Sequence, residues 1–323
     1  MRHARKPTEG MDTPASGDVN QEALFGRRSI PPQCGEFDQA HLQVHLFGRF
    51  EVLWEDRTIP LGRNTKALAI LKYMLANRTP PLSRDYLMEW LWSESSPKRA
   101  RGSLNTAIYD LRSILNSYPL PEECSTHIVL DEGHYKLCPA LQVWTDVDGF
   151  ESCYAEGCFL ERTKRLPAAV AKYEEAVRLY RGDFLSQDLY EEWTIVERER
   201  LCNAYMDTLR RLTERYMDAG QYAEGIHSCY KLLDKDVRHE AGNYLLMCCY
   251  AGLGLHSQAL LHQSSYRQML QRESNAELAT KFQDIRQKSY APEAPKDNGL
   301  TSPEVHFPEN LNWPDIDPKL TTN

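Results

Sequence analysis

The spacing of apolar side chains changes near residue 61, and this change constrains the fold more than any other feature of the sequence. Leu42, Val44 and Leu46 alternate with polar residues, which is the pattern of a half-buried strand. The alternation resumes over 50–54 after a glycine turn, and the turn "EDR" precedes a third short strand. From residue 64 onward, apolar residues instead recur every three or four positions. The sequence therefore predicts a small antiparallel sheet followed by helices.

Three helices and a closing hairpin are predicted after this sheet. Apolar stripes predict helices over 64–79 and 83–92, the second capped by Ser83. We expect its inward-facing side chains to be Tyr86, Leu87, Trp90 and Leu91. A third helix begins with Ser96 as its cap and Pro97 at its first helical position. Two short strands around the turn "DEGH" follow over 127–137. This order predicts a winged helix-turn-helix domain over residues 41–140.

The third helix begins with positively charged residues, although negatively charged residues at its start would make the helix more stable. Lys98, Arg99 and Arg101 lie in the first turns, where the helix dipole disfavours positive charge by roughly 0.3–1 kcal/mol each. At about 100° per residue, one apolar face is formed by Leu104, Ile108, Leu111 and Leu115. An adjacent face carries Lys98, Arg101, Asn105, Tyr109 and Arg112. The helix therefore has one side for its own core and one polar, basic side.

The residue types on the basic side are those that read DNA. Arginine pairs with guanine and asparagine with adenine, while lysine and tyrosine suit phosphate. A recognition helix presents its N-terminal half to the major groove, and here that half holds the cations. The alternative is an exposed basic face on an ordinary amphipathic helix. The candidate DNA-binding residues are Lys98, Arg99, Arg101, Asn105, Tyr109 and Arg112, with weaker candidates Arg63, Lys66 and Arg84 near helix starts and His134 and Lys136 at the hairpin tip.

The second half of the chain differs in charge and in pattern. Residues 41–140 carry 12 basic and 11 acidic side chains, whereas residues 141–323 carry 21 basic and 29 acidic ones. Helical spacing dominates from 147 to 289, with a helix over 167–185 and one long helix or two over 191–220. A shift of 34 residues places Tyr216 on Tyr250, Leu212 on Leu246, Gly220 on Gly254 and Gly225 on Ala259.

A 34-residue period is typical of tetratricopeptide repeats, whose stacked helix pairs leave a groove for protein partners. The sequence therefore predicts an α+β winged helix-turn-helix domain followed by an all-α, tetratricopeptide-like domain over 141–290. An unrelated helical bundle is the alternative for this second domain. Polar, proline-containing composition predicts a disordered arm over 1–40 and a disordered tail over 291–323.

Several classes of protein are not indicated. No apolar run approaches the ~20 residues that span a bilayer, and the N-terminus has no apolar signal region. The nine cysteines form no CxxC pair, so we expect reduced thiols in a cytoplasmic protein. Neither the pair Glu191–Glu192 nor the pair His239–Glu240 has a partner at catalytic spacing. No cofactor, metal or enzymatic activity is therefore predicted.

At the level of families, the stretch "LQVHLFGRFEVLWEDRTIPLGRNTKALAILKYML" resembles the opening of the streptomycete antibiotic regulatory proteins. "SPKRARGSLNTAIYDLRSIL" followed by "GHYKL" resembles their recognition helix and wing, and "LYRGDFLSQDLYEEWTIVERERL" resembles the hallmark of the bacterial transcriptional activation domain that follows. The resemblance covers about 41–285. It implies a winged-helix DNA-binding domain joined to an activation domain.

The resemblance also implies partners and a biological role. Family members bind direct repeats in promoter DNA as tandem protomers, recruit RNA polymerase and in many cases activate clusters of secondary-metabolite genes. By this resemblance, base reading is expected of Arg101, Asn105 and Arg112. The alternative function is a protein-interaction adaptor with a vestigial winged helix, which the net charge of only one positive unit over 41–140 favours.

Overall fold

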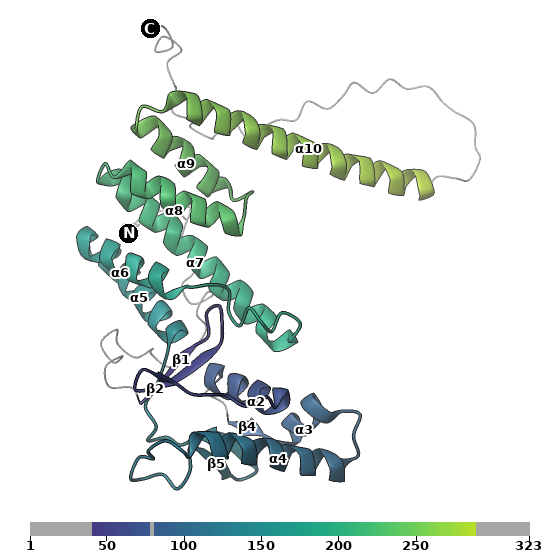
Figure 1. The fold of residues 1–323 in the computed structure, drawn as a ribbon. Helices are drawn as coiled ribbons and strands as arrows, with labels where there is room; N and C mark the ends of the chain where they lie inside the picture. Colours follow the sequence, from purple (N-terminus) through teal and green to yellow (C-terminus); the bar gives the residue numbers. More distant parts are fainter. Residues whose placement is uncertain (1–40, 78–80, 289–323) are drawn as a thin grey trace, which may run out of the picture. The chain divides into compact units, whose positions relative to one another are not determined.

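The computed structural model describes residues 41–77 and 81–288, with side chains as far as residue 272. Residues 41–267 belong to one compact unit, and the rest of the last helix belongs to a second. The two segments predicted to be disordered, 1–40 and 291–323, lie outside the described residues. The described residues form a strand-containing N-terminal region followed by helices (Figure 1).

The first sheet has four strands in the order β3-β2-β1-β7. Its strands are β1 (Leu42–His45), β2 (Glu51–Trp54), β3 (Arg57–Thr58) and β7 (Val143–Thr145). The first three are antiparallel, as predicted. A fourth strand that was not predicted, β7, pairs with β1 in parallel. The connection from β1 to β7 therefore encloses the whole winged helix.

The winged helix itself lies between β3 and β7. Its elements are α2 (Thr65–Ala76), β4 (Leu82–Ser83), α3 (Arg84–Trp92), α4 (Pro97–Leu115), β5 (Ile128–Asp131) and β6 (His134–Leu137). β5 and β6 form the predicted hairpin, and β4 adds a third strand beside β6. We call β5 and β6 with their turn the wing. The prediction that Tyr86 faces inward is wrong, because its ring is 43% exposed and stacks along Trp90.

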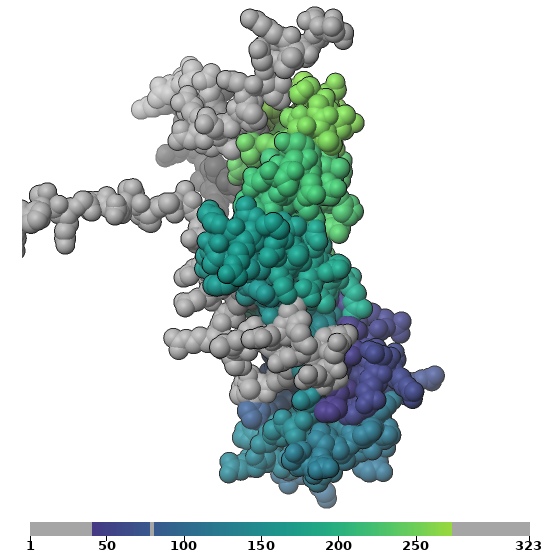
Figure 2. Space-filling view, turned by 90° about the vertical axis from the view of Figure 1, so that its left-hand side faces the viewer, coloured from purple at the N-terminus to yellow at the C-terminus, as the bar shows by residue number. Residues whose placement is uncertain are grey.

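The helical part contains three successive helix pairs. They are α5 (Asp146–Arg162) with α6 (Leu166–Leu179), α7 (Glu192–Asp218) with α8 (Tyr222–Lys235), and α9 (Glu240–Gly252) with α10 (His256–Lys288). In Figure 2 the part of the chain coloured teal through green, which contains α5 to α9, follows the order of the sequence. None of the described helices is both long and apolar enough to cross a membrane. The predicted long helix over 191–220 is the single helix α7.

The 34-residue repeat is visible in backbone hydrogen bonds. Gly220 ends α7 with a φ of 73°, and Gly254 ends α9 with a φ of 74°. The N–H of Gln221 donates to the carbonyl of Tyr216 at 2.8 Å, and the N–H of Leu255 donates to that of Tyr250 at 2.9 Å. A left-handed residue is required at both helix ends, and glycine adopts it without steric cost. The sequence repeat therefore marks two equivalent helix-to-helix turns.

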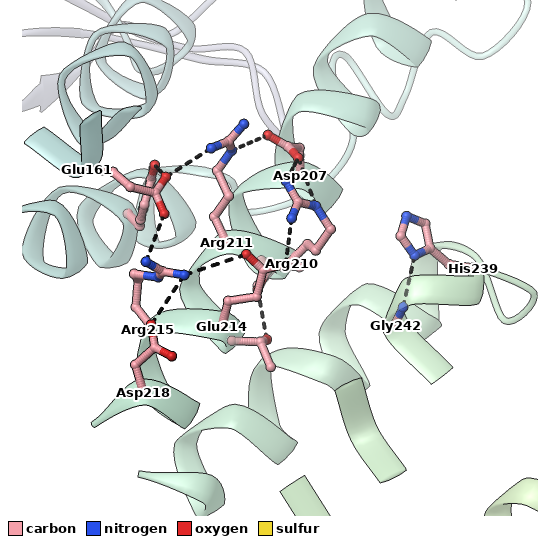
Figure 3. A network of polar contacts seen from close by, with 12 residues as sticks. Glu161, Asp207, Arg210, Arg211, Glu214, Arg215, Asp218, His239 and Gly242 are labelled. Atoms are coloured by element: carbon pink, nitrogen blue, oxygen red, sulfur yellow. Dashed lines mark hydrogen bonds and ion pairs between the residues drawn. The ribbon is translucent and has the colours of Figure 1, made fainter. Parts of the chain in front are cut away.

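A polar cluster ties the first three helices of this part together (Figure 3). Arg211 on α7 donates to Glu161 on α5 at 2.9 Å and to Asp207 at 2.7 Å. The hydroxyl of Tyr154 donates to Asp207 and that of Tyr173 donates to Glu161. Burial raises the pKa of both tyrosines, so they remain neutral donors. The cluster therefore fastens α5, α6 and α7 to one another.

His239 also has a structural role in this part of the chain. Its Nδ1 accepts a hydrogen bond from the N–H of Gly242 at 3.1 Å, which makes it the cap of α9 (Figure 3). No group of three metal-ligating side chains occurs among the described residues.

The two halves of residues 41–267 share one core through the loop between α6 and α7. We call residues 181–194 the junction segment. Phe184 and Leu185 are fully buried in the same cluster as Leu46 and Phe47, which directly follow β1. The N–H of Leu185 donates to the carbonyl of Leu46 at 2.8 Å. Gly182 lies so close to Gly48 that a Cβ added to it would be 3.0 Å from the Gly48 Cα. The predicted domain boundary near residue 140 therefore separates parts that pack against each other.

The junction segment also contacts the helices of the winged helix. Lys72 of α2 is buried, and its Nζ lies 2.8 and 2.6 Å from the two carboxylate oxygens of Asp188. The ring of Trp193 packs 5.0 Å from Tyr73 and 6.4 Å from Trp90, measured between ring centroids. The motif "YRGDFL…W" therefore connects the helical part to α2 and α3.

Candidate nucleic-acid interface

Helix α4 has the two-sided character that the sequence predicts. Its buried residues are Ala100, Leu104, Ala107, Ile108, Leu111 and Leu115. The predicted apolar face is therefore confirmed. The side chains of Lys98, Arg99, Arg101 and Asn105 are exposed, and Tyr109 is 72% exposed. Ser96 caps the helix only through its backbone position, since its side chain makes no capping hydrogen bond.

The three cations at the start of α4 take no part in the internal polar contacts of the described residues. Among the described residues, Lys98, Arg99 and Arg101 enter no hydrogen bond or ion pair that would hold them in place. Three exposed positive charges at the positive end of a helix are unfavourable for stability. Exposed cations of this kind attract anions, and contact of these three with a DNA backbone stays a prediction. We call Lys98, Arg99, Arg101 and Asn105 the basic face of α4.

Asn105 connects the basic face to α3. The Nη2 of Arg84, the first residue of α3, lies 3.5 Å from the Oδ1 of Asn105. This contact orients the asparagine amide so that its NH₂ group points away from Arg84. Sequence analysis identified both residues as candidates but not their contact. The pair places an Arg84 charge next to the basic face.

Arg112 occupies a different position from the other candidates on α4. It is half-buried, and its Nε and Nη2 both donate to the carbonyl of Ile128, at 3.0 and 2.8 Å. Ile128 is the first residue of β5, so Arg112 fixes the start of the wing to the recognition helix. A guanidinium held in this way orients the wing and has fewer donors left for a base. A base-reading role for Arg112 stays a prediction.

The remaining candidates are distributed around the domain. Lys66 donates to the carbonyl of Leu91 and lies 4.7 Å over the ring of Trp92, so it caps the C-terminus of α3. Arg63 is exposed beside a cavity of about 300 Å³ between the start of α2 and α4. Neither residue lies on the basic face.

The wing offers little free positive charge. Lys136 donates to the Oδ2 of Asp131 at 2.7 Å, and this hydrogen bond lowers the pKa of Asp131. His134 is exposed, and its Nδ1 lies 3.1 Å from the carbonyl of Glu132. The tip therefore presents two acids beside its basic residues. Minor-groove contact by His134 and Lys136 stays a prediction.

The base of the wing is fastened by a buried histidine. His127 is 1% exposed, with Nδ1 3.0 Å from the Oδ1 of Asn116 and Nε2 3.2 Å from the carbonyl of Pro119. Asn116 follows α4, so this contact joins the end of the recognition helix to the start of the wing. Burial lowers the pKa of His127, and burial lowers that of His262 on α10 as well.

We expect the protein to lose stability as the pH falls below about 6.5, the pKa of an unperturbed histidine. Below this pH the unfolded chain binds protons that the folded His127 and His262 do not, so acid favours unfolding. The melting temperature measured from pH 7.5 to pH 5.5 checks this. The variant His127→Gln with His262→Gln should flatten that dependence, and an unchanged slope would contradict the assignment.

The cysteines depart from the expectation of reduced thiols. Cys124 and Cys138 are joined by a disulfide, with their Cα atoms 6.2 Å apart. No cysteine motif marks this pair, because only the fold brings the loop after α4 against the end of β6. The other described cysteines are not disulfide-bonded: Cys153, Cys158, Cys202, Cys229, Cys248 and Cys249.

Comparison with known proteins identifies the helical part. The family described as "Bacterial transcriptional activator domain" matches residues 145–288. Residues 145–288 are therefore similar to a bacterial transcriptional activator domain. This confirms the part of the predicted family resemblance that rests on "YRGDFL…W…ER". In this activator domain the motif forms the junction segment and the start of α7, where it contacts the winged helix.

Two curated relatives and one solved structure are similar to the chain. The transcriptional regulatory protein MoaR1 of Mycobacterium bovis (strain BCG / Pasteur 1173P2) and that of Mycobacterium tuberculosis (strain ATCC 25618 / H37Rv) are each 25% identical over 144 residues. The match spans 45% of this chain and 45% of each relative, so it covers less than half of either protein.

The solved structure is that of Mycobacterium tuberculosis EmbR in complex with a low-affinity phosphopeptide. It matches with a TM-score of 0.61 and 21% identity, over 71% of this chain and 60% of that one. At 21% identity, this similarity is evidence for a shared fold alone. It confirms the predicted architecture of a winged helix followed by a helical domain.

Proposed function

We propose that this protein is a sequence-specific DNA-binding transcriptional activator. The observation that carries the proposal is the basic face of α4: Lys98, Arg99, Arg101 and Asn105 are exposed on a helix whose opposite side is buried. In this arrangement the N-terminal half of α4 enters the major groove, Arg101 and Asn105 contact bases, and Lys98 and Arg99 contact phosphates. Tyr109 and Arg84 lie beside them for further backbone contacts.

The activator domain supplies the second half of the proposal. Transcriptional regulators share this domain, which supports recruitment of RNA polymerase holoenzyme by the helical part. We further propose that two protomers bind tandem direct repeats in promoters, that the targets form a secondary-metabolite gene cluster, and that the protein acts in the bacterial cytoplasm on the nucleoid. No cofactor or catalytic activity enters this proposal.

Selection from a random-sequence duplex library, followed by a binding titration at increasing salt, tests the proposal. The slope of log affinity against log salt concentration should be about −0.9 for each phosphate that the protein neutralises. Three phosphate contacts therefore predict a slope near −3. The variant with Lys98→Ala and Arg99→Ala should reduce the slope by about two, whereas Arg178→Ala on α6 should leave it unchanged. Failure to enrich any sequence would contradict sequence-specific binding.

A protein-interaction adaptor with a vestigial winged helix is the second candidate. It is favoured by the acids of the wing tip and by the ion pair that occupies Lys136. An adaptor would enrich no sequence from the library. Genome-wide immunoprecipitation separates the two candidates in the cell, because enrichment at promoters with repeated motifs excludes the adaptor.

A further inference from the structure

The disulfide between Cys124 and Cys138 lies where the recognition helix is joined to the wing. Cys124 belongs to the loop between α4 and β5, and Cys138 directly follows β6. The N–H of Cys124 donates to the carbonyl of Pro121, and that of Cys138 donates to the carbonyl of His127, both at 2.9 Å. The bond therefore closes a ring that contains the last residues of this loop, 124–127, and the complete wing.

Two other contacts hold the same elements. Arg112 donates to the carbonyl of Ile128, and Asn116 accepts from the backbone N–H of His127 at 3.2 Å. Both contacts bind the start of β5, and neither reaches the end of β6. The disulfide is the covalent tie at that end. Without it, the loop and the end of the wing gain freedom that DNA binding must then remove.

The pair also differs from the other described cysteines in its chemistry. Cys153, Cys229 and Cys249 are fully buried. Burial raises the pKa of the thiol of Cys158, and it does the same for Cys202. Cys124 is half-buried whereas Cys138 is buried, so the side of Cys124 is the more open approach to the disulfide for a solvent thiol.

The redox conditions of the compartment bear on the role of this cysteine pair. If the protein acts on the nucleoid, as proposed above, it works among thiol reductants, where disulfides are usually transient and redox-sensing. We propose that Cys124 and Cys138 form a redox-responsive pair that sets the affinity for DNA: the disulfide form holds the wing for binding, and the dithiol form binds more weakly. This inference rests on the proposed function of the winged helix.

The chemistry is a thiol–disulfide exchange with a cellular dithiol. A thiolate of the dithiol attacks the more accessible Sγ of Cys124, and Cys138 leaves as a thiolate that takes a proton. The second thiol of the dithiol then displaces Cys124, so the reductant becomes a disulfide and both protein cysteines become thiols. Two electrons and two protons reach the protein. A low-molecular-weight disulfide such as oxidised glutathione reverses both steps.

Two measurements on the full-length chain test the proposal. Maleimide labelling with mass spectrometry, after treatment with oxidised glutathione or with dithiothreitol, reports whether this pair forms and breaks. Fluorescence anisotropy with a labelled duplex selected from a random-sequence library reports the affinity of each form. We expect the dithiol form to bind about tenfold more weakly, the cost of ordering one or two further side chains on binding.

Variants separate this effect from general oxidation. Cys124→Ser together with Cys138→Ser should bind like the reduced protein in both buffers, and Cys124→Ser alone serves if the buried Cys138 position does not accept serine. Cys202→Ser should remain redox-responsive. A pair that never forms, or equal affinity in both forms, overturns the proposal while DNA binding itself stands. Absence of DNA binding in either form overturns the proposed function and this inference together.

Discussion

Replacing Asp188 with alanine is expected to destabilise the protein by about 3 kcal/mol, because the variant leaves the ammonium group of Lys72 buried without its partner. The side chain of Lys72 is 8% exposed, and both carboxylate oxygens of Asp188 lie within 2.8 Å of its Nζ. Lys72 reaches from α2 to the junction segment and has little access to bulk water in the folded state. Thermal unfolding should show a fall in melting temperature of about 6–12 °C.

Two controls show whether this loss reflects the buried charge. Asp218→Ala removes a carboxylate that pairs with Arg215 but is 59% exposed, and it should cost less than about 1 kcal/mol. Lys72→Met combined with Asp188→Leu replaces the pair with apolar side chains and should recover most of the loss. If the melting temperature of Asp188→Ala equals that of the wild type, the ion pair does not stabilise the junction between the winged helix and the helical part.

The features that sequence analysis predicted correctly are those with a local signature. The apolar face of α4 follows from leucines at helical spacing, and those side chains are buried. The glycines at 220 and 254 lie 34 residues apart and end α7 and α9 in the same left-handed conformation. Each of these features is determined by residues that lie close together in the sequence. For such features, periodicity and glycine positions carry enough information.

The features that were missed join residues far apart in the chain. Strand β7 has three residues and β4 has two, which is too short for an alternating pattern to be recognised. Lys72 and Asp188 are separated by 116 positions, and nothing near either residue indicates a buried partner. Tyr86 fits the apolar stripe of α3, yet its ring stays partly exposed at the rim of an aromatic cluster.

The predictions for the candidate interface divide in the same way, between local features and contacts with residues distant in the chain. Residue type and helical position identified the basic face correctly as an exposed surface. The same criteria did not separate Arg112 and Lys66, whose side chains bind backbone carbonyls of β5 and α3. A basic residue on a polar face can serve the fold or a ligand, and only its contacts distinguish the two. The exposed residues Lys98, Arg99 and Arg101 are therefore the sharper targets for mutation.

Replacing Arg101 with alanine is expected to weaken binding to the selected duplex by about 1–3 kcal/mol, which is the discrimination provided by one bidentate arginine–guanine pair. Arg101 is exposed on α4, one turn from Asn105 on the same face, and no internal contact among the described residues holds it. Its removal should therefore leave the melting temperature unchanged or slightly higher, because a cation near the positive end of the helix dipole is lost.

Competition titrations with duplexes altered at single positions distinguish base reading from phosphate binding by Arg101. If Arg101 reads a base, Arg101→Ala should lose preference at one position and keep the salt slope nearly constant. If it binds phosphate, affinity should fall equally for all duplexes and the slope should shrink by about one. Arg178→Ala removes an exposed arginine from α6 and should change neither quantity. Wild-type affinity in Arg101→Ala would place the DNA-reading surface elsewhere on the winged helix.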